Sequence, residues 1–283
     1  ITDGLFLDKI MSKEEIEIVF HAAAYKHVPI VEQNPIAGLK NNIISSHNIC
    51  KVALKYEIKK VILISSDKAV RPSNVMGASK RLSEMIFQAF ADINNSSKEV
   101  HPKTKNCFYM VRFGNVLGSS GSVVPFFKEQ ILKGGPVTVT HPEIIRYFMT
   151  ISEASQLVIQ ASELSLGGDL FLLDMGSPVL IKDLAEQMIK LFGFNVKNDQ
   201  NPNGDIEILY SGLRPGEKLY EELLINAKSE PTINPLIYRA NEKTIKSSEL
   251  LRDLELLENY LRNNDEENSL QLLKELIPEW ERK

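Results

Sequence analysis

Cysteine is scarce in this sequence, which has only Cys50 and Cys107 among its 283 residues. Their separation fits neither a zinc site nor a CxxC redox motif, so we expect two buried free thiols in a reducing compartment. No metal site is predicted.

Excess charge and long apolar runs are also missing. The 33 Lys and Arg residues nearly balance the 37 Asp and Glu residues, for a net charge of −4, which argues against a nucleic-acid-binding protein that neutralises phosphates. No apolar run approaches the ~18 residues that span a bilayer, and no signal peptide is visible. An apolar content of 43% is typical of a globular enzyme, and the length allows one domain with an appendage or two domains.

The sequence does contain a regular alternation of predicted strands and helices. Apolar strands are predicted at residues 17–23, 61–65 and 107–113, with helices at 35–57 and about 76–93 between them. This order implies right-handed crossovers and a parallel sheet. Beyond it, glycines and prolines separate shorter elements, as in ligand-binding regions. Two leucine-rich amphipathic helices near the C-terminus, at about 248–262 and 268–277, are expected to be structural.

The stretch from Val61 to Lys80 carries the most informative polar residues. Its buried strand ends in Ser66-Asp67-Lys68, and a loop then leads to a helix on which Met76 and Lys80 share a face. In open α/β sheets, ligands bind outside the carboxyl ends of the strands. The segment therefore places a carboxyl, two amines and a hydroxyl where a ligand would lie.

Each of these features has a functional and a structural interpretation. Burial costs Asp67 and Lys68 free energy unless they are functional or paired, so they are either an acid and a base or a structural ion pair. Lys80 suits a hydride-transfer enzyme, in which the amine binds a nicotinamide ribose, or is a solvated lysine. The small residues Ala22 and Ala23 allow the close approach of a flat ligand or of a packed helix.

Five segments follow one another in a recognisable order and spacing. They are HAAAYKHVPIVEQNP, ISSDKAVRPSNVMGASKR, VRFGNVLGSSGSVVPFF, HPEIIRYFMTISEA and GLRPGEKLYEEL. Together they resemble the nucleotide-sugar 4,6-dehydratases of polysaccharide biosynthesis, a branch of the extended short-chain dehydrogenase/reductases. The resemblance covers residues 1 to about 225.

The resemblance implies a Rossmann-like, doubly wound parallel sheet with a smaller C-terminal α/β substrate domain. Residues 1–117 would form a partial NAD-binding domain and residues 118–283 mainly the substrate domain, with part of 142–176 returning to the first. The family's glycine-rich phosphate turn is missing, so we expect that about two strand-helix units, and any membrane anchor, precede Ile1, and that this chain alone binds NAD poorly. The complete protein is expected to be a cytoplasmic homo-oligomer that meets the inner membrane only through that upstream region.

The resemblance also implies a reaction. In the family, C4 of the sugar is oxidised by NAD, the ketone acidifies the C5 proton, water is eliminated across C5 and C6, and the hydride returns to C6. A UDP-N-acetylhexosamine is the implied substrate, Asp67 the acid at the C6 hydroxyl and Lys68 the base at C5. Ser66 is expected near the C4 oxygen and Lys80 at the nicotinamide ribose. Further cofactor contacts are expected from Ala22, Ala23, Asn42 and Ser65.

Met76 occupies a catalytic position of the family but departs from its pattern, because most of the superfamily has tyrosine four residues before the helical lysine. A thioether cannot accept the C4 hydroxyl proton, so the base for C4 oxidation is unassigned. A water relayed through Ser66 or Lys80 is one hypothesis. The substitution is similar to that in the large, membrane-anchored dehydratases.

Substrate contacts are implied by the same matches. The matched residues are Asn115, Arg146 and Arg214 for the diphosphate, Thr138 and Thr140 for uracil, Glu217 for ribose or an arginine, and Lys26 and His27 for the sugar. Guanidinium groups suit phosphate oxygens, although a surface salt bridge is the alternative for either arginine.

Two other functions stay open. A 4-epimerase or reductase of the same superfamily needs only C4 redox chemistry, for which an Asp67-Lys68 pair is superfluous. A non-catalytic nucleotide-sugar-binding module is consistent with Met76 and the missing turn, but a decayed site has no reason to keep Asp67, Lys68 and Lys80 together.

Overall fold

The computed structural model describes residues 1–96, 107–222, 229–242 and 245–282. The chain divides into two compact units. The first unit comprises Ile1–Phe113, Leu157–Asp174 and Glu222–Lys283, and the second comprises Gly114–Gln156 and Met175–Glu221.

The first unit is built on a six-stranded sheet. In spatial order its strands are β1 (Ile18–His21), β2 (Lys60–Ile64), β3 (Cys107–Arg112), β8 (Leu170–Leu173), β13 (Ile237–Ala240) and β12 (Ser229–Pro231). The first four are parallel, whereas β13 and β12 pair in antiparallel fashion. Val61, Ile62 and Leu63 of β2 are fully buried, as expected of a parallel strand covered on both faces. The predicted α/β fold with a parallel sheet is confirmed.

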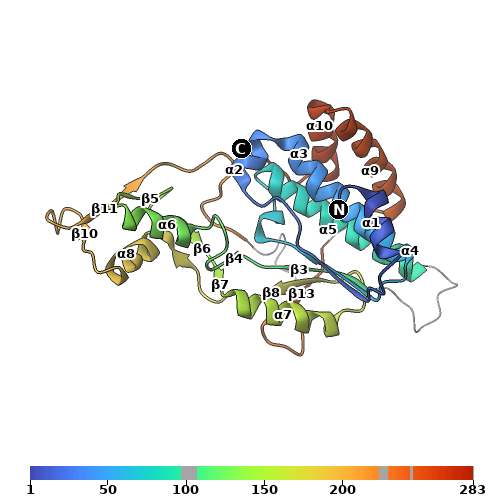
Figure 1. Cartoon of the computed structure of the whole chain (residues 1–283), viewed down its shortest axis with the longest axis horizontal. Helices are drawn as coiled ribbons and strands as arrows, with labels where there is room; N and C mark the ends of the chain where they lie inside the picture. Colours follow the sequence, from blue (N-terminus) through green and yellow to red (C-terminus); the bar gives the residue numbers. More distant parts are fainter. Residues whose placement is uncertain (97–106, 223–228, 243–244, 283) are drawn as a thin grey trace. The chain divides into compact units, whose positions relative to one another are not determined.

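Helices pack against this sheet. They are α1 (Gly4–Met11), α2 (Val28–Gln33), α3 (Pro35–Leu39), a π-helical turn (Lys40–Ile44), α4 (Ser45–Lys55), a 3₁₀ turn (Asp67–Ala69), α5 (Val75–Ser96), α9 (Ser247–Arg262) and α10 (Glu266–Leu276). Figure 1 shows α5 and α9 on one side of the sheet and α7 (Ile151–Leu164) on the other. One hydrophobic core joins residues of the sheet with α4, α5, α9 and α10.

The second unit has its own core. A three-stranded parallel sheet has the order β10 (Val196–Lys197), β11 (Ile206–Tyr210) and β5 (Val137–Val139). Two short pairs join β4 (Asn115–Val116) to β7 (Phe148–Met149) and β6 (Ile145–Arg146) to β9 (Val179–Leu180). The helices α6 (Val123–Leu132) and α8 (Ile181–Leu191) contribute buried residues such as Phe127 and Ile189 to this core.

The C-terminal segment packs differently from the division expected from the sequence. Residues 222–283, assigned mainly to the substrate domain, belong to the first unit. The physical reason is that β13 pairs with β8 and that four leucines of α9 are buried in the first unit's core. The sequence pattern also missed α1, α2 and α6, because these helices are short or contain proline.

Cys50 is a buried free thiol, as predicted, and burial raises the pKa of this thiol well above its usual range. The side chain of Cys107 lies outside the described residues. Across the described ranges, no helix combines the length and the apolar character needed to cross a membrane.

Candidate functional site

The turn after β2 holds the predicted catalytic residues. The Ser65 N–H extends the pairing of β2 with β3 by donating to a β3 carbonyl at 2.8 Å. Ser66 is extended, and Asp67–Ala69 form a single 3₁₀ turn. The Ser66 hydroxyl accepts from the Lys68 N–H at 3.3 Å and donates to Asp67 Oδ1 at 2.9 Å. It therefore caps the turn and orients the carboxylate.

Asp67 and Lys68 form an ion pair, with Lys68 Nζ 3.0 Å from Asp67 Oδ1. The Asp67 side chain is 2% exposed, whereas that of Lys68 is 21% exposed. Asp67 Oδ2 is buried and has no hydrogen-bond partner among the described residues, so one carboxylate oxygen is held and the other keeps its hydrogen-bonding capacity. The sequence placed a buried acid beside an amine at this strand end; their roles as acid and base stay predictions.

Lys80 reaches back from α5 to the same strand end. Its Nζ donates to the Ile64 carbonyl at 2.6 Å, and the residue is only 6% exposed. Burial lowers the pKa of Lys80 to about 8, and the Glu84 carboxylate, one turn further along α5, opposes this shift. His21 at the end of β1 is also buried; burial, followed by the Lys80 charge, lowers the pKa of His21 to about 4, so this imidazole is neutral at pH 7.

Met76 lies in the first unit's hydrophobic core, where its side chain packs and offers no proton acceptor. The next residue, Gly77, lets α5 approach the 3₁₀ turn Asp67–Ala69 closely. A Cβ atom on Gly77 would lie 2.2 Å from the Lys68 carbonyl oxygen. The Gly77 N–H donates to Asn74 Oδ1 at 2.7 Å, which satisfies one free donor in the first turn of α5.

Three of the predicted cofactor residues have surfaces or donors that fit NAD. Ala22 and Ala23 are exposed just beyond the end of β1, and their small side chains leave room for a flat ligand. Lys80 carries three N–H donors, and the hydrogen bond to the Ile64 carbonyl uses one of them. These residues are able to hold a nicotinamide ribose and its neighbouring ring.

The other two predicted cofactor residues are engaged within the protein. Asn42, in the π-helical turn, accepts from the Tyr25 N–H at 2.7 Å and donates to the Tyr25 carbonyl at 3.1 Å. It also donates to the Ser79 hydroxyl at 2.8 Å. Ser65 donates to the buried Glu84 carboxylate. Asn42 thus fixes the loop after β1, and Ser65 fixes the end of β2. Both residues support the candidate site through contacts within the protein.

The second unit brings four predicted substrate residues together. Glu217 Oε1 accepts from the Thr140 hydroxyl at 3.2 Å and from Arg146 Nη2 at 3.3 Å. Glu217 Oε2 accepts from the Arg214 N–H at 3.1 Å. Arg146 is 7% exposed and also donates to two backbone carbonyls, so it braces this loop in the free protein, whereas Arg214 is exposed.

The remaining substrate candidates lie outside that cluster. Gln130 holds Thr138 by accepting from its N–H at 3.0 Å and donating to its hydroxyl at 2.8 Å. Asn115 begins β4 and is half-buried. In the first unit, Lys26 and His27 are exposed in the loop before α2.

Sequence analysis missed a set of charged residues that adjoin the end of β2. They are Arg81, Glu84, Arg112, Glu242 and Glu279, which are paired with one another. The available signals were an Arg-Glu pair three residues apart on an otherwise buried helix and an arginine in the apolar strand 107–113. Among the residues that the structure describes, no group of three His, Cys, Asp or Glu side chains is placed to hold a metal ion.

Comparison with known proteins gives matches over most of the chain. The model of the family described as polysaccharide biosynthesis protein matches residues 1–242. The capsular polysaccharide biosynthesis protein CapD of Staphylococcus aureus is 48% identical over 265 residues, which cover 93% of this chain and 41% of CapD. A UDP-glucose 4-epimerase of Rickettsia bellii is 34% identical over 272 residues, which cover 93% of this chain and 74% of the epimerase. The chain thus spans less than half the length of CapD.

A solved structure agrees with the sequence matches. The X-ray structure of Pen from Bacillus thuringiensis superposes with a TM-score of 0.72 at 32% sequence identity, and the match covers 90% of this chain and 79% of Pen. The similarity extends over both units of the chain, because a match of this coverage cannot be confined to either one.

Proposed function

Because the chain belongs to the family of polysaccharide biosynthesis proteins, whose relatives include nucleotide-sugar-modifying short-chain dehydrogenase/reductases, we propose that it dehydrates a UDP-N-acetylhexosamine to the 4-keto-6-deoxy sugar. The observation that carries this proposal is the Asp67-Lys68 pair beside Ser66 at the end of β2. Dehydration needs an acid and a base within reach of adjacent carbons. Redox chemistry at C4 alone needs neither member of that pair.

The proposed acid and base exchange one proton before the reaction. In the ion pair, Asp67 is a carboxylate and Lys68 an ammonium, which is the wrong protonation state for an acid and a base. Moving one proton across the 3.0 Å contact gives a carboxylic acid and a neutral amine. Lys68 then takes the C5 proton, while Asp67 protonates the C6 hydroxyl, which leaves as water. When the hydride returns to C6, the Lys68 ammonium gives a proton to C5, which leaves the pair as carboxylate and neutral amine. The proton released from the C4 hydroxyl then restores the ion pair.

NAD, when bound, supplies the acceptor and donor for the hydride that leaves C4 and returns to C6. For this hydride transfer the chain contributes a binding surface for the cofactor and the positive charge of Lys80. Lys80 is held against the Ile64 carbonyl, from where we propose that its remaining donors bind the nicotinamide ribose. Ala22 and Ala23 are proposed to contact the cofactor. Asn42 and Ser65 are proposed to hold the loop after β1 and the end of β2 in place around it. The base for C4 oxidation is a water positioned by Ser66 or Lys80, since Met76 cannot serve.

The nucleotide is proposed to bind the second unit. The exposed Arg214 suits the diphosphate, whereas Arg146 would reach it only by exchanging its contact with Glu217. Thr138 and Thr140 are proposed to contact uracil. Asn115, Lys26 and His27 complete the proposed substrate contacts.

Solvent deuterium distinguishes dehydration from epimerisation. The complete gene product is incubated with UDP-N-acetylglucosamine in deuterated water, and the products are analysed by NMR. A dehydratase gives a 4-keto-6-deoxy sugar with deuterium at C5, because the C5 proton is exchanged through Lys68. The 34% identity with an epimerase makes 4-epimerisation the second candidate, and its product is the C4 epimer without deuterium at C5. That second outcome would refute the proposal.

Gly77→Ala is expected to disturb the catalytic turn. The new Cβ would meet the Lys68 carbonyl oxygen at 2.2 Å and its carbon at 3.1 Å, and backbone atoms cannot rotate away as a side chain does. The turn must shift, and a misplacement of about 1 Å costs up to ~10²-fold in rate. The measurement is the rate of product formation by the complete gene product.

The matched control is Gly38→Ala, where the new Cβ meets only a side-chain methyl of Val31, at 2.6 Å. This variant adds a methyl group at another crowded helical glycine, one that does not contact the turn of Lys68. We expect it to keep most of the activity. Equal rates for Gly77→Ala and the unchanged protein would contradict the close approach of α5 to the turn.

A further inference from the structure

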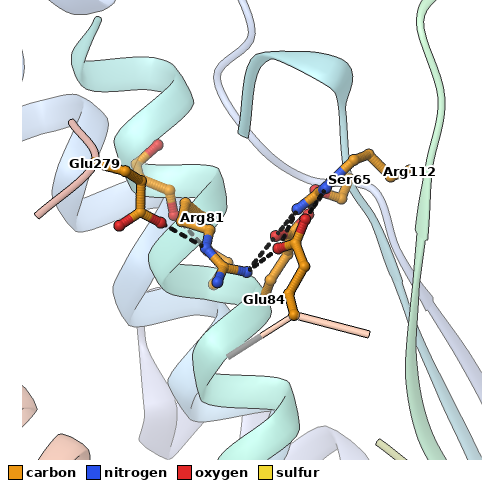
Figure 2. Close-up of polar contacts among 8 residues, drawn as sticks. Ser65, Arg81, Glu84, Arg112 and Glu279 are labelled. Atoms are coloured by element: carbon orange, nitrogen blue, oxygen red, sulfur yellow. Dashed lines mark hydrogen bonds and ion pairs between the residues drawn. The ribbon is translucent and has the colours of Figure 1, made fainter. Parts of the chain in front are cut away.

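A buried network of ion pairs lies next to the catalytic turn. Figure 2 shows Arg81 between Glu279 and Glu84, with Arg112 and Ser65 on the far side of Glu84. The side chains of Glu84 and Arg112 are fully buried, and that of Arg81 is 3% exposed. Charges at this depth persist only when they are paired and hydrogen-bonded.

Glu84 is the centre of this network. Its Oε1 accepts from Ser65 and from Arg112 Nε at 3.1 Å, and its Oε2 accepts from Arg112 Nη2 at 2.7 Å and Arg81 Nη1 at 3.2 Å. Burial alone would raise the pKa of Glu84, but the charge and hydrogen bonds of Arg112 outweigh it and hold this pKa below its usual range. Glu84 is therefore a carboxylate at neutral pH.

Glu242 closes the network on the side away from Ser65. It accepts from Arg112 Nη1 at 2.8 Å and lies 2.9 Å from Arg81 Nη1. Its side chain is 6% exposed. Glu242 thus shares both arginines with Glu84 and has similar burial, but Glu84 lies on α5 one helical turn after Lys80, whereas Glu242 is not on that helix.

Lys80 connects the network to the proposed cofactor site. It lies one helical turn before Glu84 on α5, and its Nζ is fixed to the carbonyl of Ile64, the residue before Ser65. The charge of Lys80 interacts with the Glu84 carboxylate on α5, which raises the pKa of Lys80, and it lowers the pKa of His21 on β1. His21 is neutral at pH 7, so the carboxylate of Glu84 is the charge that stabilises a buried ammonium at this position.

We propose that Glu84 is a positioning residue that acts through Lys80: its carboxylate keeps the buried Lys80 amine in the charged form while holding Ser65 at the end of β2. The inference rests on the proposed function only for what a charged Lys80 does, namely binding the cofactor ribose. The alternative is that Glu84 only stabilises the ion-pair network. In that case, replacing Glu84 or Glu242 should have the same effect on the titration of Lys80.

The test is an NMR titration of Lys80 in lysine-labelled protein, with its signal assigned by its loss in Lys80→Arg. We expect a midpoint near pH 8 in the unchanged protein. In Glu84→Gln it should fall by roughly one pH unit or more, because a buried ammonium loses its nearest opposite charge. In the matched variant Glu242→Gln, which removes the same charge from the same arginines, the midpoint should stay within about 0.3 pH units.

Two outcomes overturn the proposal: equal displacement in both variants, or no displacement in Glu84→Gln. If Glu84→Gln does not fold, the charge-balanced variant Glu84→Gln with Arg112→Gln replaces it, and a smaller fall in the midpoint is expected, because the lost charge of Arg112 partly offsets that of Glu84. The titration needs no enzymatic activity. A protein that shows the expected titrations but forms no dehydrated sugar would refute the proposed function and leave this inference standing.

Discussion

Asp67→Asn is expected to lower the formation of the 4-keto-6-deoxy sugar by about 10²–10⁴-fold, the usual contribution of a positioned general acid. The amide matches the carboxylate in shape and still accepts from Ser66 through its oxygen, so the turn should keep its geometry. What is lost is the proton for the departing C6 hydroxyl. The measurement is the rate of product formation by the complete gene product, followed by NMR.

The exchange of the C5 proton separates the role of Asp67 from that of Lys68. In Asp67→Asn, Lys68 can still lose its proton to solvent and act as the base, so substrate recovered from deuterated water should carry deuterium at C5 although no water is eliminated. Lys68→Met should abolish the exchange as well. Asp92→Asn is the control, since Asp92 is an exposed carboxylate of α5 that accepts from Ser247 at 3.1 Å. Full activity in Asp67→Asn would remove the acid from the mechanism.

The structure makes this pair of tests meaningful because the acid and the base are so close. Asp67 and Lys68 are neighbours in sequence on one 3₁₀ turn, and their charged atoms are 3.0 Å apart. A change in either residue therefore alters the protonation of the other. Loss of product alone would not show which residue is the acid and which the base. Measuring C5 exchange and C6 elimination separately does show this.

The end of β2 could be predicted from the sequence because its signals are local. A run of apolar residues followed at once by Ser66, Asp67 and Lys68 specifies a buried strand with a polar end, and the structure has β2 at Lys60–Ile64. The helical spacing of α5 and of the C-terminal helices is equally local. These elements need no knowledge of what they pack against.

The charged network could not be predicted in the same way, because its pairs form only through tertiary packing. Glu84 meets Arg112 across 28 residues, and Arg112 meets Glu242 across 130 residues. No periodicity connects such positions. The C-terminal segment was misplaced for a related reason: its leucine pattern shows that one face is buried, but it does not show that α5 is the partner.

Arg146 shows why a functional role cannot be inferred from the residue type alone. A guanidinium in a matched segment predicts a phosphate contact, yet in the free protein Arg146 binds Glu217 and two backbone carbonyls. The charge of Arg146 is already neutralised by Glu217, so a phosphate would have to compete with this carboxylate for the guanidinium. Arg214, whose backbone is fixed by the same glutamate, has the more accessible side chain.

Arg112→Met is expected to lower the free energy of unfolding by about 3–5 kcal/mol, the cost of removing one partner from a buried ion pair. Glu84 would stay buried with Arg81 as its remaining cationic partner among the described residues, and Glu242 would lose two hydrogen bonds. For a protein of this size the midpoint of thermal unfolding should fall by roughly 10 °C. Arg262→Met is the control, because Arg262 is exposed and its contact with Glu258 is long at 3.5 Å, so little change is expected.

The pH dependence of this loss separates electrostatics from packing. The pKa of Glu84 is lowered in the folded protein, so its contribution is fully present above its unfolded value of about 4.5 and is lost as the pH falls through the lower folded value. The difference between Arg112→Met and the unchanged protein should therefore be largest near pH 7 and shrink below about pH 4. Adding Glu84→Met to Arg112→Met should restore part of the stability, because no unpaired charge is left in the core. A double variant as unstable as Arg112→Met at every pH would show that the arginine acts through its packing and not through its charge.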